Sequence, residues 1–372
     1  MTPDQIDGHQ GRGRVEQLLP SERTDEALAE RFRVFAREEC SGMSGLNVMS
    51  PTYETLSVAI ADNPGLLALA RECMVGQPIP NLFFAAVKRI SDSRCDELAE
   101  HYTRIGEGGV PGCGLTESFA RFCARHESEI VELVRTRRVQ TNEIRRCSYL
   151  MPAFGTVFLD AGELPLALID VGASAGLNLL WESYQYRYSN GSVFGPSDAE
   201  VVIECELRND MPDIPKEMPD VVFRMGVDLN PVDLGDDEQF LWMMALVWPD
   251  HPDRAALLRA ARRVWLNDPP RVERGDALEV LPRVLAEVPC DTALCVFHCH
   301  TLNQFPAESR NAFYEILDRE SFDRSVYHVS SEGEYMRVNR IVGGVADTIL
   351  SARRNAHGRW IEWLSVQRQE TR

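Results

Sequence analysis

The amino-acid sequence predicts an α/β protein, with a doubly wound, mostly parallel sheet, an antiparallel C-terminal hairpin and an all-helical domain before the sheet. Two observations support this prediction. Apolar residues recur every three or four positions through the first half of the chain, and short apolar runs alternate with helical segments in the second half. We expect a flexible tail at 1–22, a helical domain at 23–157 and the sheet domain at 158–372.

Length and composition limit the function classes. The 372 residues suffice for about two domains, and no run of about 18 apolar residues could span a membrane. The first residues lack the apolar core of a signal peptide, so we expect a cytoplasmic protein. A formal net charge of −18 argues against broad nucleic-acid binding, which leaves a small-molecule substrate as the expected partner and the oligomeric state open. Ten scattered cysteines without a CxxC pair predict buried free thiols.

Helix start signals justify the first domain. Ser50-Pro51 and Asn63-Pro64 each place an N-cap residue before a proline at the first helical position, where the missing N–H costs no hydrogen bond. The segments 82–90, 117–134 and 142–154 then repeat apolar residues at helical spacing. Because no flexible tether follows, we expect this helical domain to cap the carboxyl ends of the strands.

Strands and helices alternate after residue 163, which is typical of a doubly wound sheet. The strand at 201–207 is assigned to a hairpin within a polar insertion at about 187–220, and the last two strands to the C-terminal hairpin. The expected strands are 164–171, 201–207, 221–228, 271–276, 292–298, 325–331, 346–354 and 358–366, and the expected helical regions are 176–184, 236–265, 277–288 and 306–320.

The loop after the first strand fits two motifs. Gly172-Ala-Ser174-Ala-Gly176 spells G-x-S-x-G, the elbow that presents a nucleophilic serine in α/β hydrolases. With Asp170 it also spells an acidic-x-Gly-x-x-x-Gly loop, which holds a nucleoside cofactor after a first strand. The hydrolase needs strands and an oxyanion loop upstream, whereas the upstream region is helical. The sequence therefore favours the cofactor loop, with a Ser174 hydrolase as a lesser alternative.

Acidic residues follow three successive strands. Asp170 suits the ammonium group of S-adenosylmethionine and would repel the pyrophosphate of NAD, Asp228 suits ribose hydroxyls, and Asp276 suits the adenine amino group. Asp228 and Asp276 could instead be helix N-caps, and the insertion at 187–220 must account for an unusually long spacing from Gly172 to Asp228. The expected cofactor-binding residues are Asp170, Gly172, Ala173, Ser174, Gly176, Asn178, Asp228, Leu229, Asp276 and Ala277.

A family resemblance rests on six segments that run across both halves of the chain. They are TRRVQTNE (136–143), LIDVGASAGLNLLW (168–181), GVDLNPVDL (226–234), RGDALEVLP (274–282), VFH (296–298) and HGRWIEWL (357–364). On these segments the chain resembles an uncharacterised bacterial family, the domain of unknown function 2332. That family is similar in fold to class I S-adenosylmethionine-dependent methyltransferases, so the resemblance implies a Rossmann-like sheet of the methyltransferase type. It implies no substrate.

Two histidines close the fourth strand, over which a methyltransferase of this class holds its methyl acceptor. His298 and His300 are the expected catalytic residues, with His298 as a general base because the imidazole pKa lies near neutrality. A structural His298 bonded to a loop carbonyl is the alternative. We expect no metal, because the two histidines have only Asp276 as a possible further ligand.

Four hydrogen-bonding residues precede the last helix before the sheet: Gln140, Thr141, Asn142 and Glu143. They fit either a lid over the substrate or a helix start. The function predicted from the whole sequence is S-adenosylmethionine binding with methyl transfer to a small or mid-sized acceptor. A non-catalytic nucleoside-binding or regulatory protein is the main alternative.

Overall fold

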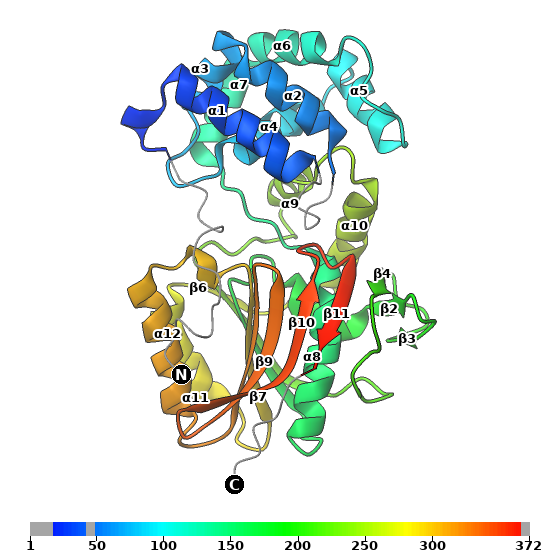
Figure 1. Cartoon of the computed structure of the whole chain (residues 1–372), viewed down its shortest axis with the longest axis vertical. Helices are drawn as coiled ribbons and strands as arrows, with labels where there is room; N and C mark the ends of the chain where they lie inside the picture. Colours follow the sequence, from blue (N-terminus) through cyan, green and yellow to red (C-terminus); the bar gives the residue numbers. More distant parts are fainter. Residues whose placement is uncertain (1–17, 42–48, 366–372) are drawn as a thin grey trace. The chain divides into compact units, whose positions relative to one another are not determined.

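A computed structural model of the chain, which describes residues 18–41 and 49–365, divides into two units by its contacts (Figure 1). We call Arg14–Thr141 with Gly235–Leu258 the helical unit, and Asn142–Leu234 with the residues from Arg259 onward the sheet unit. Most of the tail expected at 1–22 lies outside the described residues.

Helices of the helical unit begin at the N-cap residues that the sequence predicts. Ser50 and Asn63 cap α2 and α3 with their side chains, each before a proline, as the sequence predicts. Aromatic side chains fill the core, in which Tyr53 stacks on Phe84 with ring centroids 4.0 Å apart. The helices are α1 (Asp25–Phe35), α2 (Pro51–Ala61), α3 (Pro64–Arg71), α4 (Ile79–Ser91), α5 (Glu97–Gly106), α6 (Leu115–Arg125), α7 (Glu127–Thr136) and α9 (Asp237–Ala245), with a 3-10 turn at Pro20–Glu22 and a π-helical turn at Ala36–Cys40.

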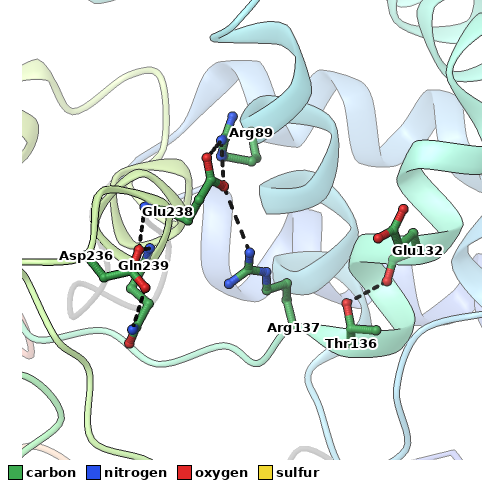
Figure 2. Close-up of polar contacts among 7 residues, drawn as sticks. All are labelled: Arg89, Glu132, Thr136, Arg137, Asp236, Glu238 and Gln239. Atoms are coloured by element: carbon green, nitrogen blue, oxygen red, sulfur yellow. Dashed lines mark hydrogen bonds and ion pairs between the residues drawn. The ribbon is translucent and has the colours of Figure 1, made fainter.

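Helix α9 comes late in the chain but belongs to the helical unit. Trp242 is buried in that unit's core, and its Nε1 donates to the Arg138 carbonyl over 2.7 Å. Figure 2 shows Glu238 at the start of α9 facing Arg89 and Arg137; its Oε2 lies 2.8 Å from Arg89 and 4.0 Å from Arg137. The expected helical region 236–265 is therefore two helices, and α10 (Pro252–Asn267) follows an interruption.

The sheet unit carries strands β1 (Leu166–Val171), β2 (Gln185–Tyr188), β3 (Val193–Phe194), β4 (Val202–Leu207), β5 (Val221–Asp228), β6 (Val272–Arg274), β7 (Ala293–Cys299), β8 (Val326–Glu332), β9 (Tyr335–Val342), β10 (Val345–Arg354) and β11 (Trp360–Leu364). They form one sheet in the order β3-β2-β4-β11-β10-β9-β8-β7-β1-β5-β6. The run β6-β5-β1-β7-β8 is parallel, and β8 to β11 is antiparallel. The expected α/β class, with a mostly parallel sheet and antiparallel C-terminal strands, is confirmed.

Helices cover both faces of the parallel strands, and β1 and β7 are buried along their whole length, as expected of central parallel strands. Helices α11 (Ala277–Glu287) and α12 (Ala307–Glu320) pack on one side, and α8 (Cys147–Asp160) packs on β4, β7 and β10 (Figure 1). Because α8 contacts these strands, it belongs to the sheet unit, which begins at Asn142. The boundary suggested by the sequence lies at residue 157, inside α8.

Three local features differ from the sequence prediction. Strand β9 was not predicted, and it pairs with both β8 and β10, so the C-terminal strands form a meander rather than a single hairpin. Strand β4 pairs in parallel with β2 and β11 instead of forming a hairpin, and β2 pairs antiparallel with the short β3. Residues Leu177–Ser183 form a 3-10 helix. The Tyr184 and Tyr186 hydroxyls donate hydrogen bonds to its Leu177 and Trp181 carbonyl oxygens.

Alternation along the strands assigns side chains to the two faces of the sheet. Asp170 is in register with Phe297, whose ring lies 5.1 Å from Phe154 of α8, so Asp170 lies on the α8 face. His298, the next residue of β7, lies on the opposite face, with its ring 5.9 Å from Phe313 of α12. The two faces of one strand thus separate two of the expected site residues.

Candidate functional site

The candidate site lies at the carboxyl edge of the parallel strands. Strand β1 pairs with β5 on one side and with β7 on the other, so the chain order reverses at β1. In open α/β sheets, ligands bind outside the carboxyl ends of the strands at such a switch point. The glycine loop 172–176 directly follows β1 at this edge.

The loop has an unusual backbone that β5 holds in place. Gly172, Ser174 and Gly176 all have positive φ angles, of 81°, 54° and 73°. A positive φ is strained for serine, and such strain is concentrated at functional sites. Asp228 fixes this conformation, because its Oδ2 accepts a hydrogen bond from Ser174 N over 2.8 Å and its Oδ1 accepts one from Asn230 N over 2.7 Å.

The two glycines of the loop are required by packing within the protein. A Cβ atom at Gly172 would lie 2.2 Å from the Thr301 hydroxyl oxygen, and one at Gly176 would lie 2.7 Å from the ring of Pro270. The sequence placed both glycines in a loop that holds a nucleoside cofactor. The close neighbours in the structure are the protein's own side chains.

Asp170 is the most unusual group of the loop region. It is 1% exposed, and its Oδ2 has no hydrogen-bond partner among the described residues. Burial, reinforced by the charge of Asp228 and opposed by Arg146, raises the pKa of Asp170 well above its usual value. The Ser174 hydroxyl nearby in the chain is also buried and unpartnered.

The remaining cofactor-binding residues expected from the sequence have other surroundings. Asp276 is exposed and caps α11 by accepting a hydrogen bond from Leu278 N over 2.8 Å. Ala277, the first residue of α11, is buried in the hydrophobic core between α11 and the sheet. Leu229 is exposed. Asn178 is buried, with its Oδ1 3.6 Å from the Cys147 sulfur. The structure therefore brings Asp170, Ser174 and Asp228 together and uses Asp276 as a helix cap.

His298 is held on the α12 face by a buried chain of hydrogen bonds. Its Nδ1 lies 2.7 Å from Glu332 Oε1, and its Nε2 lies 3.0 Å from His328 Nε2. The same Glu332 oxygen accepts from the Thr301 and Leu302 backbone N–H groups, so this chain orders the turn after β7. Both ring nitrogens of His298 are engaged on the face opposite Asp170, which fits a positioning role better than a base.

His300 has the free nitrogen that His298 lacks. It follows the end of β7 with a φ of 56°, and its Nε2 is buried without a partner among the described residues. Burial, with the cationic Arg354 and Arg146 nearby, lowers the pKa of His300 well below its usual value. Its imidazole is therefore neutral at pH 7. No group of three or more His, Cys, Asp or Glu residues in 18–41 and 49–365 is arranged to hold a metal.

The four residues proposed as a lid are divided between the units. Gln140 and Thr141 belong to the helical unit, and Asn142 and Glu143 to the sheet unit. Asn142 is buried and accepts from Leu177 N over 2.9 Å, and Glu143 is buried with its Oε2 3.3 Å from His357 Nδ1. These two side chains anchor loops, which fits the alternative role as a helix start.

Sequence reasoning missed several polar residues on the α8 face, chiefly Arg354, Tyr149 and Ser331, all of which are fully buried. Arg354 had a usable signal. Alternate residues of a strand share a face, so Arg354 lies on the same face of β10 as the apolar Leu350 and Ala352. The pattern therefore predicts a buried arginine. Within the described ranges, no helix is long and apolar enough to cross a bilayer.

The raised pKa of Asp170 predicts a pH-dependent effect of Asp170→Asn. Because the folded pKa lies above the unfolded value of about 3.9, Asp170 contributes most stability below that value and loses it as the pH rises through the folded pKa. Asparagine does not titrate. The free energy of unfolding of Asp170→Asn, relative to that of the wild type, should therefore rise by up to about 1.4 kcal/mol per pH unit as the pH rises through the folded pKa. Urea unfolding of both proteins at several pH values from 5 to 8 measures this difference.

The exposed Asp291 provides the control for this experiment. Asp291→Asn makes the same chemical change at a surface position and so separates the effect of burial from that of the substitution itself. A constant difference between the wild type and Asp170→Asn would show that Asp170 ionises normally in the folded protein.

Comparison with known protein families finds a match that covers both units of the chain. The chain matches the family described as "Uncharacterized protein conserved in bacteria (DUF2332)" over residues 29–363. No curated protein and no solved structure matches it. Because the match spans most of the chain, the protein belongs to this family of uncharacterised bacterial proteins.

Proposed function

We propose that the sheet unit binds S-adenosylmethionine at the loop 172–176 and transfers its methyl group to a small or mid-sized acceptor. One observation carries the proposal: the buried, unpartnered carboxyl group of Asp170 lies at the switch point of the sheet. Buried polar groups are almost always hydrogen-bonded, and an exception at the edge where such sheets bind ligands points to a ligand.

The acidic groups fit a cation better than a phosphate. Asp228 lies close enough to Asp170 to raise its pKa, so the pyrophosphate of NAD would meet two acids. The amino-acid tail of S-adenosylmethionine carries an ammonium group that can donate to Asp170 Oδ2. Asp228 accepts two backbone hydrogen bonds at this edge, and a carboxylate is a group to which ribose hydroxyls can donate.

The sheet order also supports the methyltransferase-type Rossmann fold. The parallel strands β6-β5-β1-β7-β8 have the chain order 3-2-1-4-5, which is the order of doubly wound nucleotide-binding sheets. Antiparallel strands continue the sheet beyond β8, in line with the type that the family resemblance implies.

The chemistry of methyl transfer assigns a role to His300. S-adenosylmethionine supplies an electrophilic methyl group, and an acceptor that carries a proton must lose it. His300 follows the end of β7 with a neutral imidazole and a free Nε2, which can accept that proton. His298 then holds the turn in place through Glu332.

Two other functions remain as alternatives. A non-catalytic nucleoside-binding protein would keep the loop and fill the edge near β7 with side chains. A serine hydrolase would use Ser174, but its hydroxyl has no histidine partner in the part of the chain described, where β1 is also the first strand. A fluorophosphonate probe that leaves Ser174 unlabelled excludes the hydrolase.

Titration calorimetry with S-adenosylmethionine, S-adenosylhomocysteine and NAD at pH 6.5 tests the proposal. We expect both S-adenosyl ligands to bind and NAD to fail. Because the ligand ammonium favours ionised Asp170, binding should release a proton, and the measured enthalpy should then depend on the ionisation enthalpy of the buffer. The Asp170→Asn variant should show no such release. Binding of NAD alone would contradict the proposal.

Asp228→Ala should weaken S-adenosylhomocysteine binding by roughly 5- to 150-fold, which corresponds to the loss of hydrogen bonds worth about 1–3 kcal/mol. Asp228→Asn retains one acceptor for Ser174 N and should weaken binding less. Calorimetry measures the affinity, and circular dichroism reports the fold. Asp220→Ala, at an exposed position before β5, should bind as the wild type does. Unchanged affinity in a folded Asp228→Ala variant would move the site elsewhere.

A further inference from the structure

Arg354 carries a fully buried guanidinium group. Its side chain is 0% exposed, and none of its three guanidinium nitrogens has a partner among the residues that the structure describes. An isolated buried charge is among the most unfavourable groups in a protein interior. The Tyr149 ring, 5.1 Å from the guanidinium carbon, offers a cation–π contact but accepts no conventional hydrogen bond.

Other unpartnered polar atoms surround this guanidinium. The Tyr149 and Ser331 hydroxyls and His300 Nε2 are buried, and none of them has a hydrogen-bond partner in the described chain. Burial raises the pKa of Tyr149 and of Cys299 and lowers that of His300, and the charge of Arg354 opposes the first two shifts and reinforces the third. Four separate elements thus direct polar groups to one place: α8, the end of β7, β8 and the end of β10.

The cluster is rigidly built. Ser148 Oγ donates to the Gly358 carbonyl over 3.0 Å, which ties the loop after Arg354 to α8. A Cβ atom at Gly358 would lie 2.1 Å from the Arg145 carbonyl oxygen, so loop and helix are in direct contact. The positions of Arg354 and Tyr149 are therefore fixed before any ligand arrives.

The charges around the cluster do not cancel. Glu332 is paired with His298 at 2.7 Å, and Glu143 with His357 at 3.3 Å. Asp170 lies on the same face, but burial raises its pKa well above its usual value and so disfavours its charged form. Arg354 and Arg146 thus remain without a carboxylate in the cluster, and an anion is the group that would balance them.

We propose that Arg354 and Tyr149, beside His300, bind the carboxylate of a small-molecule ligand. A guanidinium presents paired N–H donors that match the two oxygens of a carboxylate. Of the two cations Arg354 and Arg146 only Arg354 is fully buried, and a carboxylate balances its single charge, whereas a phosphate dianion would bring a second negative charge into the interior. The site itself does not depend on S-adenosylmethionine.

Its location makes this ligand the methyl acceptor. Asp170 is in register with Phe297 of β7, and Cys299, two residues further along β7, is in register with Ser331, so the carboxylate site adjoins the end of β1. This assignment rests on the proposed function, in which Asp170 contacts the cofactor and His300 takes a proton from the acceptor. The acceptor is then a small carboxylic acid.

Thermal unfolding of the full chain with sodium benzoate, acetate or succinate, against sodium chloride at equal ionic strength, tests the site. We expect at least one carboxylate to raise the Tm of the wild type in a saturable way. Arg354→Met should lose this shift and, without ligand, should be at least as stable as the wild type, because an unpaired buried charge is removed. Arg353→Met, at the exposed neighbouring position paired with Glu362, should keep the shift.

Tyr149→Phe provides a second variant that removes only the unpartnered hydroxyl. It should fold normally and weaken carboxylate binding by about 2- to 10-fold. Equal carboxylate stabilisation in the wild type and Arg354→Met, no stabilisation of the wild type, or a larger shift with inorganic phosphate would overturn the proposal. Competition by S-adenosylhomocysteine would overturn the acceptor assignment. Carboxylate binding without S-adenosyl binding would instead contradict only the proposed function.

Discussion

The carboxyl edge of the sheet depends on the carboxylate of Asp228. One of its oxygens holds Ser174 N in the loop after β1, and the other holds Asn230 N in the turn after β5. The loop contains three residues with positive φ, and a backbone of this kind persists only when its surroundings fix it. Asp228 supplies that fixation from the neighbouring strand, and the register of β1 with β5 sets Asp170 opposite Gly226, two residues before Asp228.

The strict alternation of strand side chains divides the candidate chemistry between two faces. On the α8 face lie Asp170, Ser331 and Arg354, whose side chains have polar atoms without a partner in the described part of the chain. On the α12 face, His298 bonds to both His328 and Glu332. The network on the α12 face orders the turn after β7, because Glu332 accepts from the Thr301 and Leu302 N–H groups, and the unpartnered groups on the α8 face suit ligand binding. A single strand, β7, contributes to both.

The sequence predicted the central strands well because their physical signal is strong. Strands buried on both faces are continuous apolar runs, and β1 and β7 begin and end within about two residues of the expected limits. Strand β9 was missed because Arg337, Asn339 and Arg340 interrupt its apolar pattern. The unit to which α9 belongs depends on contacts distant in sequence, such as that of Trp242 with Arg138, and no local pattern encodes these.

Site prediction was limited for a different reason. The acids at the ends of three strands could be read from the sequence, but the hydrogen bonds that each one makes could not. Asp276 proved to be a helix cap, and His298 faces away from Asp170 because of the parity of its position in β7. Arg354 was passed over because a charged residue at a strand end is usually taken to be exposed.

The cysteines beside the candidate site have a consequence for its chemical durability. Burial raises the pKa of Cys299 to about 11 and that of Cys147 well above its usual value. At pH 7 only about one Cys299 thiol in ten thousand is then ionised, and thiolates are the form that oxidants and alkylating agents attack. The exposed Cys95, Cys113 and Cys290 would react first. Oxidants would therefore modify the exposed cysteines of this protein before the two buried cysteines near the carboxyl edge of its sheet.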